Sequence, residues 1–387
     1  MKVLFITHSF ARNGGDATGS PELRLARALR DEDIEVLLVA PGYSGRVSEE
    51  IDGIAVERFA LPRRDIALAL PGAPSQPRLR ASWRSRITTL QFLSAEFTSA
   101  VRARRAFEPS IVHAHWWFPG GLVGTWVSAL GNVPLVTSLH RADLRSAQAG
   151  SFARPLFRHV MKQSAIVTAD SHGLARSARA VISTSDPIVA PMPAATEVFV
   201  PGGERSTDRL LLVAGLGPEN GIEQTLEAIA SMKHRISIDI VGEGPAGAEF
   251  RALAAAMGLG NRVRWHAPLD DAALARLCQS TTAVVVPSLH EWVPPIAVHA
   301  LLCRTPVVAF DFGGVTDVVH HDRTGILVPP SNTMALTRAL DALFSRPDLG
   351  ANLGEAGRIY ALATFAPESV ARRFAGIYRQ ALVSTQS

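Results

Sequence analysis

Short apolar runs rich in β-branched residues alternate with segments of helical period along the whole chain. Many of these runs are apolar at consecutive positions, which is typical of strands in a parallel sheet that helices cover on both faces. The first half carries VLFIT from Val3, EVLLVA from Glu35, SIVHAH from Ser110, PLVTSLH from Pro134 and AIVTA from Ala165. The second half carries LLLVAG from Leu210, ISIDIVG from Ile236, RVRWH from Arg262, AVVVPS from Ala283, PVVAF from Pro306 and GILVPP from Gly325. This alternation predicts an α/β fold with two doubly wound, Rossmann-like sheets.

The length of 387 residues exceeds what one hydrophobic core ordinarily supports, so two domains are expected. The stretch 193–208 is rich in Pro, Gly and polar residues and has no regular period, which marks a linker. We therefore expect one Rossmann-like domain over 1–195 and a second over 196–366, facing a central cleft. Residues 61–80 hold several prolines without a clear period, and they predict a long loop on the first domain.

Composition narrows the protein class. Apolar residues make up 47% of the chain, enough for two cores. Cys278 and Cys303 lie in apolar stretches and have neither a disulfide framework nor zinc-site spacing, which favours a reducing compartment. The apolar run at the start is too short for a signal peptide, and no later window has the roughly 18 to 20 apolar residues of a membrane span. We expect a cytoplasmic protein.

The formal net charge is only +4, but arginines gather between 61 and 109 and outnumber the acidic residues there. A basic patch of this kind suits an anionic acceptor or peripheral contact with an acidic membrane surface. A solvated arginine-rich surface is the more ordinary interpretation of the same pattern. Because no recognition motif accompanies the charge, we expect no nucleic-acid partner.

Ligands of open parallel sheets bind beyond the carboxyl ends of the strands, so the loops there hold the candidate residues. Gly14 and Gly15 lie in such a loop before a helix, which predicts either a phosphate site or a plain tight turn. His140 leaves the strand PLVTS at its carboxyl end, which favours a functional role. His113 and His115 share one side of a strand, but no carboxylate or cysteine at ligand spacing accompanies them. We therefore expect packed histidines there and no metal site.

The second half repeats the loop pattern more clearly. AGLGPENG, which contains Gly215 and Asn220, is a glycine-rich loop before a helix and has the sequence of an anion site. The turn VGEGP, with Gly242 and Glu243, follows directly after a strand. PSLHEWVPP then brings Glu291 to a strand end, before a helix from about Pro295.

In their order these segments resemble the retaining GT-B glycosyltransferases often called family 4, which include mannosyl- and glucosyltransferases. The resemblance covers nearly the whole chain and rests on IEVLLVAPG, IVHAHWWFPGG, PLVTSLHRAD, the linker, GPENG, VGEGP, PSLHE and TGILVPP. It implies carbohydrate biosynthesis from a nucleotide sugar, without a metal cofactor. PESVARRFAGIYRQAL looks like the family's terminal helix, so 367–387 is expected to pack back on the first domain, the acceptor side. The second domain is then the donor side.

The resemblance also implies a degenerate donor-diphosphate site. The family neutralises the diphosphate with an Arg and a Lys, whose positions fall on Gly215 and Asn220 in this chain. Of the family's two acidic residues, the one near the sugar is Glu291, and the one on the ribose is replaced by His299. Each charge-assisted hydrogen bond is worth about 1.5 to 3 kcal/mol, so losing two cations weakens diphosphate binding strongly.

The segment after the first acidic position departs from the family as well. Trp292 and Val293, followed by two prolines that cannot donate a backbone N–H, stand where the family usually has a glycine-rich turn. The resemblance assigns these two residues to donor binding, together with Gly14, Gly15, Gly242 and Glu243.

The sequence leaves three hypotheses open. The first is an active glycosyltransferase with a rebuilt donor site, in which His140 and Glu291 are the catalytic residues. The second is a catalytically silent homologue that binds or activates a partner transferase. The third is a transferase for a cyclitol, or for a donor with a single phosphate, because fewer phosphate charges need fewer cations.

Overall fold

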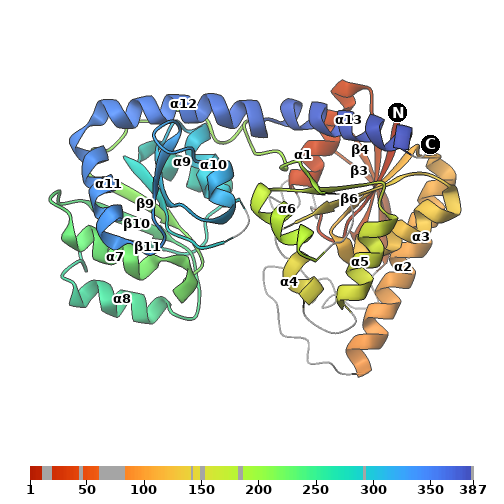
Figure 1. The fold of residues 1–387 in the computed structure, drawn as a ribbon, viewed down its shortest axis with the longest axis horizontal. Helices are drawn as coiled ribbons and strands as arrows, with labels where there is room; N and C mark the ends of the chain where they lie inside the picture. The colour runs from red at the N-terminus through yellow and green to blue at the C-terminus, as the bar shows by residue number, and fades with distance from the viewer. Residues whose placement is uncertain are drawn as a thin grey trace. The chain divides into compact units, whose positions relative to one another are not determined.

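The computed structural model describes residues 1–10, 20–42, 47–60, 83–140, 143–148, 153–181, 186–290 and 293–384. The chain divides into unit 1, formed by Met1–Pro193 with Pro367–Ser387, and unit 2, formed by Ala194–Ala366. Each unit is an α/β domain built on a largely parallel sheet (Figure 1). The predicted fold class is confirmed.

The sheet of unit 1 has the strand order β3-β4-β2-β1-β5-β6-β7-β8. Its strands are β1 (Lys2–Ile6), β2 (Glu35–Gly42), β3 (Val47–Ile51), β4 (Ile54–Ala60), β5 (Ile111–His115), β6 (Leu135–Leu139), β7 (Ile166–Ala169) and β8 (Ile188–Val189). The predicted strands correspond to β1, β2, β5, β6 and β7, whereas β3, β4 and β8 were not predicted. Among the described strands, only β3 and β4 pair antiparallel, through a tight turn in which Asp52 and Gly53 have φ of 51° and 78°.

The sheet of unit 2 is wholly parallel, with the order β11-β10-β9-β12-β13-β14. Its strands are β9 (Arg209–Val213), β10 (Ser237–Val241), β11 (Val263–His266), β12 (Ala283–Val286), β13 (Val307–Phe310) and β14 (Gly325–Val328). All six were predicted. The order of strands turns back at β9, so the loops after β9, β10 and β12 lie at the point where parallel sheets bind ligands.

Helices cover both faces of each sheet. In unit 1 they are α1 (Ser20–Leu29), α2 (Trp83–Phe107), α3 (Leu122–Gly131), α4 (Asp143–Gln148), α5 (Ala153–Gln163), α6 (His172–Arg179) and α13 (Pro367–Ser384). In unit 2 they are α7 (Ile222–Ser231), α8 (Gly247–Ala256), α9 (Asp271–Ser280), α10 (Pro295–Leu302), α11 (Thr333–Ser345) and α12 (Pro347–Phe365). None of the helices in the described ranges is long and apolar enough to pass through a membrane.

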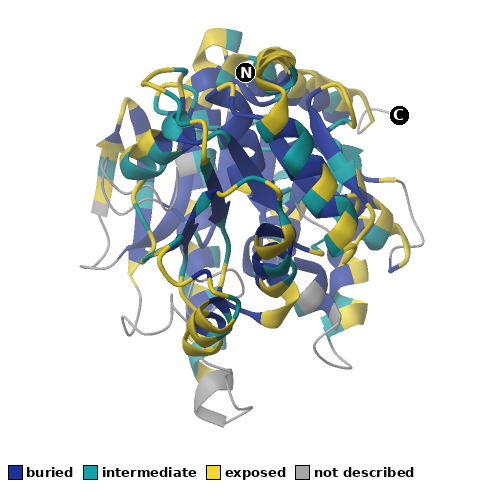
Figure 2. Cartoon of the chain, turned by 90° about the vertical axis from the view of Figure 1, so that its left-hand side faces the viewer, coloured by how far each residue is buried: buried dark blue, intermediate teal, exposed yellow. Residues whose placement is uncertain are grey.

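Strand β1 shows why these apolar runs become central strands. Val3 and Phe5 belong to the apolar cluster under α1 and α13, whereas Leu4 and Ile6 belong to the cluster under α2 and α3. Successive side chains of a strand point to opposite faces, so a run without polar residues buries both faces. Most of the strand surface is accordingly buried, and exposed residues concentrate on the outer sides of helices and in loops (Figure 2).

Helix α13 completes unit 1 although it lies at the other end of the chain from α1. The two helices pack against each other, and they lie side by side in Figure 1. Phe374 and Tyr378 of α13 are fully buried, and the Tyr378 hydroxyl lies 2.7 Å from Nδ1 of His113 on β5. The last helix is therefore anchored to the centre of the first sheet by apolar contacts and by one buried hydrogen bond.

Candidate functional site

The residues predicted for the site fall into both units. Gly14, Gly15, Glu291 and Trp292 lie outside the described residues, so their roles stay predictions. His140 lies in unit 1, directly after β6. The others lie in unit 2: Gly215, Asn220, Gly242, Glu243, Val293 and His299. The structure thus offers one group of candidate residues around His140 and another in the loops of unit 2.

His140 is a buried side chain, 6% exposed, whose two ring nitrogens are both engaged. Its Nδ1 lies 2.9 Å from Oδ2 of Asp170, and its Nε2 lies 3.2 Å from Nδ1 of His115. The rings of His115 and His140 are nearly parallel, with an angle of 10° between their planes. A proton on either nitrogen of His140 therefore has an acceptor within hydrogen-bond distance.

Asp143, in the first turn of α4, fixes the backbone at His140. Its carboxylate accepts hydrogen bonds from the backbone N–H of His140 at 2.7 Å and of Trp117 at 3.2 Å. The indole N–H of Trp117 donates in turn to the carbonyl of Asp143 at 3.2 Å. The loops that follow β5 and β6 are therefore tied to each other beside His140.

Glu22 of α1 brings another carboxyl to the same place. Glu22, His115 and His140 are all buried, and each offers one ligand-type atom within 4.8 Å of the other two. This is a set of three ligands for a divalent metal ion, although the two histidine nitrogens also face each other as a hydrogen-bonded pair. The sequence showed no carboxylate beside the histidines of β5, because Glu22 approaches from a helix far away in the chain. The expected absence of a metal stays a prediction.

Burial and charge shift the titration of these side chains. Burial by itself lowers the pKa of His140, but the charges of Asp170, Glu22 and Asp143 outweigh burial and raise that pKa to about 9. Burial raises the pKa of Glu22 to about 7, against the charge of His140. Burial holds the pKa of His115 well below its ordinary value. Near neutral pH, His140 is therefore charged and His115 is neutral.

Asp170 was missed by sequence analysis, although a usable signal was present. It follows β7 as His140 follows β6, and the two strands are parallel neighbours that pair Leu139 with Ala169. Residues that come next after paired positions lie side by side at the sheet edge. The strand-end argument that selected His140 therefore also selects Asp170.

Trp116 follows β5 in a conformation that bulky residues rarely adopt, with φ of 72°. Its ring centroid lies 4.9 Å from that of His140 and 5.4 Å from that of His8. The backbone is held on both sides, because Trp116 N–H donates to the carbonyl of Ser138 and the Trp116 carbonyl accepts from Gly121. An aromatic face beside a charged imidazole suits the apolar face of a sugar ring.

In unit 2, Asn220 ties the glycine-rich loop to the end of the segment after β12. Its Nδ2 donates to the carbonyl of Gly215 at 2.8 Å, and its Oδ1 lies 2.7 Å from Nε2 of His290. Asn220 is 8% exposed. The two positions that the family resemblance assigns to donor cations are thus bonded to each other, and Asn220 serves as a structural tie.

The VGEGP turn packs against the same loop. The Leu216 N–H donates to the carbonyl of Glu243 at 2.9 Å, while the Glu243 side chain is exposed. A Cβ at Gly242 would lie 1.9 Å from the Ala214 carbonyl oxygen, and one at Gly244 would lie 2.5 Å from that of Leu216. Both positions require glycine, because the two backbones touch there.

The remaining candidates lie on or before α10, which begins at Pro295 as predicted. The ring of His299 stacks on Phe199, with centroids 3.7 Å apart and planes at 8°. Phe199 therefore covers one face of the His299 ring. Val293 is half-buried and packs against the apolar cluster around α10.

A matched pair of variants tests the tie at Asn220. A Cβ at Gly215 would lie 3.6 Å from Asn220 Nδ2, an ordinary contact, so Gly215→Arg is expected to change the free energy of unfolding by less than about 1 kcal/mol. Asn220→Lys removes both hydrogen bonds and places an ammonium in a buried position, so it is expected to cost about 2 to 4 kcal/mol. Urea unfolding measures both values. Equal losses in the two variants would contradict the role given to Asn220.

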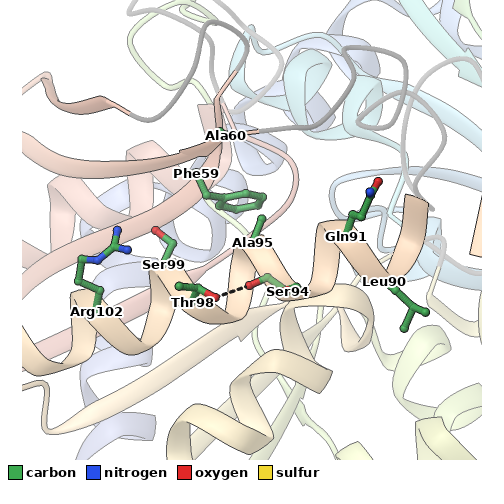
Figure 3. A pocket seen from close by; sticks show the side chains of 9 residues that line it. All are labelled: Phe59, Ala60, Leu90, Gln91, Ser94, Ala95, Thr98, Ser99 and Arg102. Carbon is green, nitrogen blue, oxygen red and sulfur yellow. Dashed lines mark hydrogen bonds between the residues drawn. The ribbon is translucent and has the colours of Figure 1, made fainter. Parts of the chain in front are cut away.

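A hollow of about 520 Å³ lies between β4 and α2 in unit 1. Phe59 and Ala60 line it from β4, and α2 lines it with Leu90, Gln91, Ser94, Ala95, Thr98, Ser99 and Arg102. Figure 3 shows the Phe59 ring facing the row of small and hydroxylated side chains of α2. Arg102 adds a positive charge to this lining, and its Nη1 lies 3.9 Å from Oε1 of Glu57. The lining surface is mainly apolar, and Gln91, Arg102 and the hydroxyl groups of α2 are its polar side chains.

Two α/β domains built on largely parallel sheets are the architecture of the GT-B glycosyltransferases. Family models match both halves of the chain. The glycosyl transferase 4-like domain matches residues 23–193, and the model of glycosyl transferases group 1 matches residues 197–360. The chain therefore belongs to the glycosyltransferase family that these domains define, and it is a transferase.

Similar proteins agree with this family. The 2-deoxystreptamine N-acetyl-D-glucosaminyltransferase of Streptomyces fradiae is 27% identical over 365 residues, which cover 84% of this chain and 82% of that protein. The D-inositol 3-phosphate glycosyltransferase of a Nocardioides species is 30% identical over 318 residues, which cover 70% of this chain and 67% of that protein.

Solved structures share the fold. Sucrose-phosphate synthase from Thermosynechococcus elongatus has a TM-score of 0.76 at 21% identity, and the match covers 98% of each chain. Anabaena HepE in complex with UDP has a TM-score of 0.71 at 18% identity, and the match covers 98% of this chain and 100% of that one.

Proposed function

We propose that this glycosyltransferase takes its sugar from a sugar nucleotide and transfers it with retention of the anomeric configuration. The observation that carries the proposal is His140, which is buried at the carboxyl end of β6 with its Nδ1 2.9 Å from Oδ2 of Asp170. In the transfer, the bond from C1 of the sugar to the diphosphate oxygen breaks, and an acceptor hydroxyl bonds to C1 on the same face. The hydroxyl proton passes to the leaving diphosphate. That HepE was solved with UDP supports a nucleotide donor.

The proposal gives His140 and Glu291 the catalytic roles. Glu291 orients the sugar hydroxyls, and Trp116 offers its ring to the apolar face of the sugar. His299, whose ring stacks on Phe199, contacts the ribose in this proposal. The other residues proposed to bind the donor are Gly14, Gly15, Gly215, Asn220, Gly242, Glu243, Trp292 and Val293. No metal ion enters the proposed step.

We infer that backbone N–H groups meet the donor phosphates in place of side-chain cations. Helix α7 begins after Gly221, whose φ is 68°, and no side chain caps its first turn. A helix N-terminus attracts anions through its dipole and its free N–H groups. Glu223 in the same turn weakens that attraction. The nucleotide without its sugar should therefore bind weakly.

For the acceptor we propose a small hydroxylated ring. Two similar proteins are named for 2-deoxystreptamine and D-inositol 3-phosphate, both of which are rings of this kind. The arginines between 61 and 109 favour an anionic acceptor, and among them Arg102 borders the hollow beside α2. A peripheral membrane contact, a partner transferase and a cytoplasmic location stay predictions.

The test is a matrix of sugar nucleotides against neutral, phosphorylated and aminated cyclitols, with nucleotide release as the signal. We expect one donor to give release that depends on an acceptor and is lost in Glu291→Ala. Proton NMR of the product should show the donor's anomeric configuration. No release with any pair, together with co-purification of another transferase, would instead support a silent homologue.

A further inference from the structure

The side chains of Glu22, His115 and His140 meet inside unit 1, although α1, β5 and the end of β6 supply them separately. All three residues are buried, and the ligand-type atom that each offers lies within 4.8 Å of the other two. Buried charged groups in proteins are paired or coordinate metal ions. Two imidazoles with one carboxylate form a ligand set for zinc, whereas magnesium and calcium prefer oxygen ligands.

The two histidine nitrogens already have the spacing of zinc ligands. Nδ1 of His115 and Nε2 of His140 are 3.2 Å apart. Zinc–nitrogen bonds of about 2.0 to 2.1 Å at a tetrahedral angle place two ligand nitrogens about 3.3 Å apart. An ion can therefore bind to both rings with little change in the distance between these nitrogens, and the carboxylate of Glu22 supplies the third ligand atom. The hydrogen bond between the two nitrogens is then lost, and its proton passes to solvent.

The contacts around the three ligands fit the same arrangement. Nδ1 of His140 lies 2.9 Å from Oδ2 of Asp170, and a histidine that binds a metal almost always donates its other ring N–H to a carboxylate, a carbonyl or water. Asp143 accepts the backbone N–H of His140 at 2.7 Å, which fixes the position of this ligand. Nε2 of His115 is buried without a hydrogen-bond partner among the described residues, so Nδ1 joins this ring to the site.

We propose that Glu22, His115 and His140 form a site for an exchangeable zinc ion, and that zinc bound there stops glycosyl transfer. Structural zinc sites are closed by four protein ligands, whereas three ligands leave a fourth position open. The effect on transfer rests on the proposed function, in which His140 is catalytic and no metal takes part. Zinc occupies Nε2 of His140 while Asp170 holds Nδ1, so neither ring nitrogen is left for the donor.

Calorimetric titration of the whole chain with zinc chloride tests the site without any sugar substrate. Wild type should bind one equivalent of zinc, and magnesium chloride should give no binding signal. Glu22→Gln keeps the size of the side chain but removes its charge. It should weaken zinc binding by about tenfold or more, because even the loss of a partner outside the ligand set costs about 10- to 100-fold. In protein labelled with ¹⁵N histidine, one equivalent of zinc should shift the NMR signals of His115 and His140 together.

Glu35→Gln is the matched control, because Glu35 is an exposed glutamate at the start of β2 in the same unit. This variant should bind zinc as tightly as wild type. The proposal is overturned if wild type binds no zinc, or if Glu22→Gln binds zinc as tightly as wild type, because the ion would then be held elsewhere on the chain.

The effect on transfer is measured as the ratio of nucleotide-release rates with and without one equivalent of zinc, compared within each protein. Zinc should lower the rate by about a hundredfold in wild type and in Glu35→Gln, as the loss of a positioned catalytic group does. It should have little effect in Glu22→Gln. Zinc bound to an unslowed wild-type enzyme would overturn the inhibitory role. Zinc binding by a chain that transfers no sugar would instead contradict the proposed function and support the site.

Discussion

Replacing His140 by alanine is expected to lower the transfer rate by about a hundredfold or more, since positioned charged groups contribute at this level to transition states. The variant removes the imidazole that contacts Asp170 and whose charge acts on Glu22. Because the role proposed for His140 is in the transfer step, kcat should fall while KM for the donor changes little. Steady-state nucleotide release with the best donor and acceptor measures both constants.

His159→Ala is the control for this variant. His159 is an exposed histidine of α5 in the same unit, so its removal should leave kcat unchanged. Thermal unfolding of His140→Ala should show a folded protein, because apolar clusters on both faces of the sheet hold unit 1. A folded His140→Ala protein with more than about a third of the wild-type kcat would exclude a catalytic role.

The central strands were predictable because both of their faces are buried. Runs such as VLFI and AVVV carry no polar residue to mark a side that faces solvent, and such a pattern is typical of a central strand in a parallel sheet. The hairpin of β3 and β4 was missed although its signal is present. Asp52-Gly53 is a turn dipeptide between two runs of strand-forming residues, and both residues adopt the positive φ that such turns need.

The contacts around His140 could not be predicted from the sequence. His140 stood out because it ends a strand, whereas Glu22 reaches it from a helix near the start of the chain. No spacing rule links residues so far apart in sequence. Asn220 differs, because its position could be assigned from the sequence but its role could not. The family resemblance places a lysine of the donor site there, whereas the structure shows a buried Asn220 that hydrogen-bonds Gly215 and His290. A substitution that removes a ligand contact can thus create a structural one.

A buried acidic residue of α2 was likewise not predicted from the sequence. Glu96 lies in the middle of α2, fully buried, on the same helix face as Phe92 and Ala100 four residues to either side. Those two residues belong to the apolar cluster on that face of the sheet. Within the described part of the chain, neither carboxylate oxygen of Glu96 has a hydrogen-bond partner. Burial raises the pKa of Glu96 to about 8.

Glu96→Gln is therefore expected to stabilise the protein increasingly as pH rises. The folded-state pKa of Glu96 lies above its unfolded value of 4.5, so the native state binds the extra proton between pH 4.5 and about 8. The contribution of Glu96 to stability is intact below pH 4.5 and falls by about 1.4 kcal/mol per pH unit across that window. Glutamine keeps the shape of the neutral acid and has no proton to lose. The gain over wild type should thus approach about 4 kcal/mol at pH 8 and vanish near pH 4.5.

Urea unfolding of both proteins at pH 5 and at pH 8 isolates this contribution, because His140, Glu22 and other titrating groups cancel in the difference. Glu50→Gln, at an exposed position of β3, provides the surface control and should show no gain that depends on pH. A constant difference between Glu96→Gln and wild type at both pH values would mean that Glu96 is ionised in the folded protein. In that event a cation or several donors must reach its carboxylate, because an ionised carboxylate does not persist alone in an apolar core.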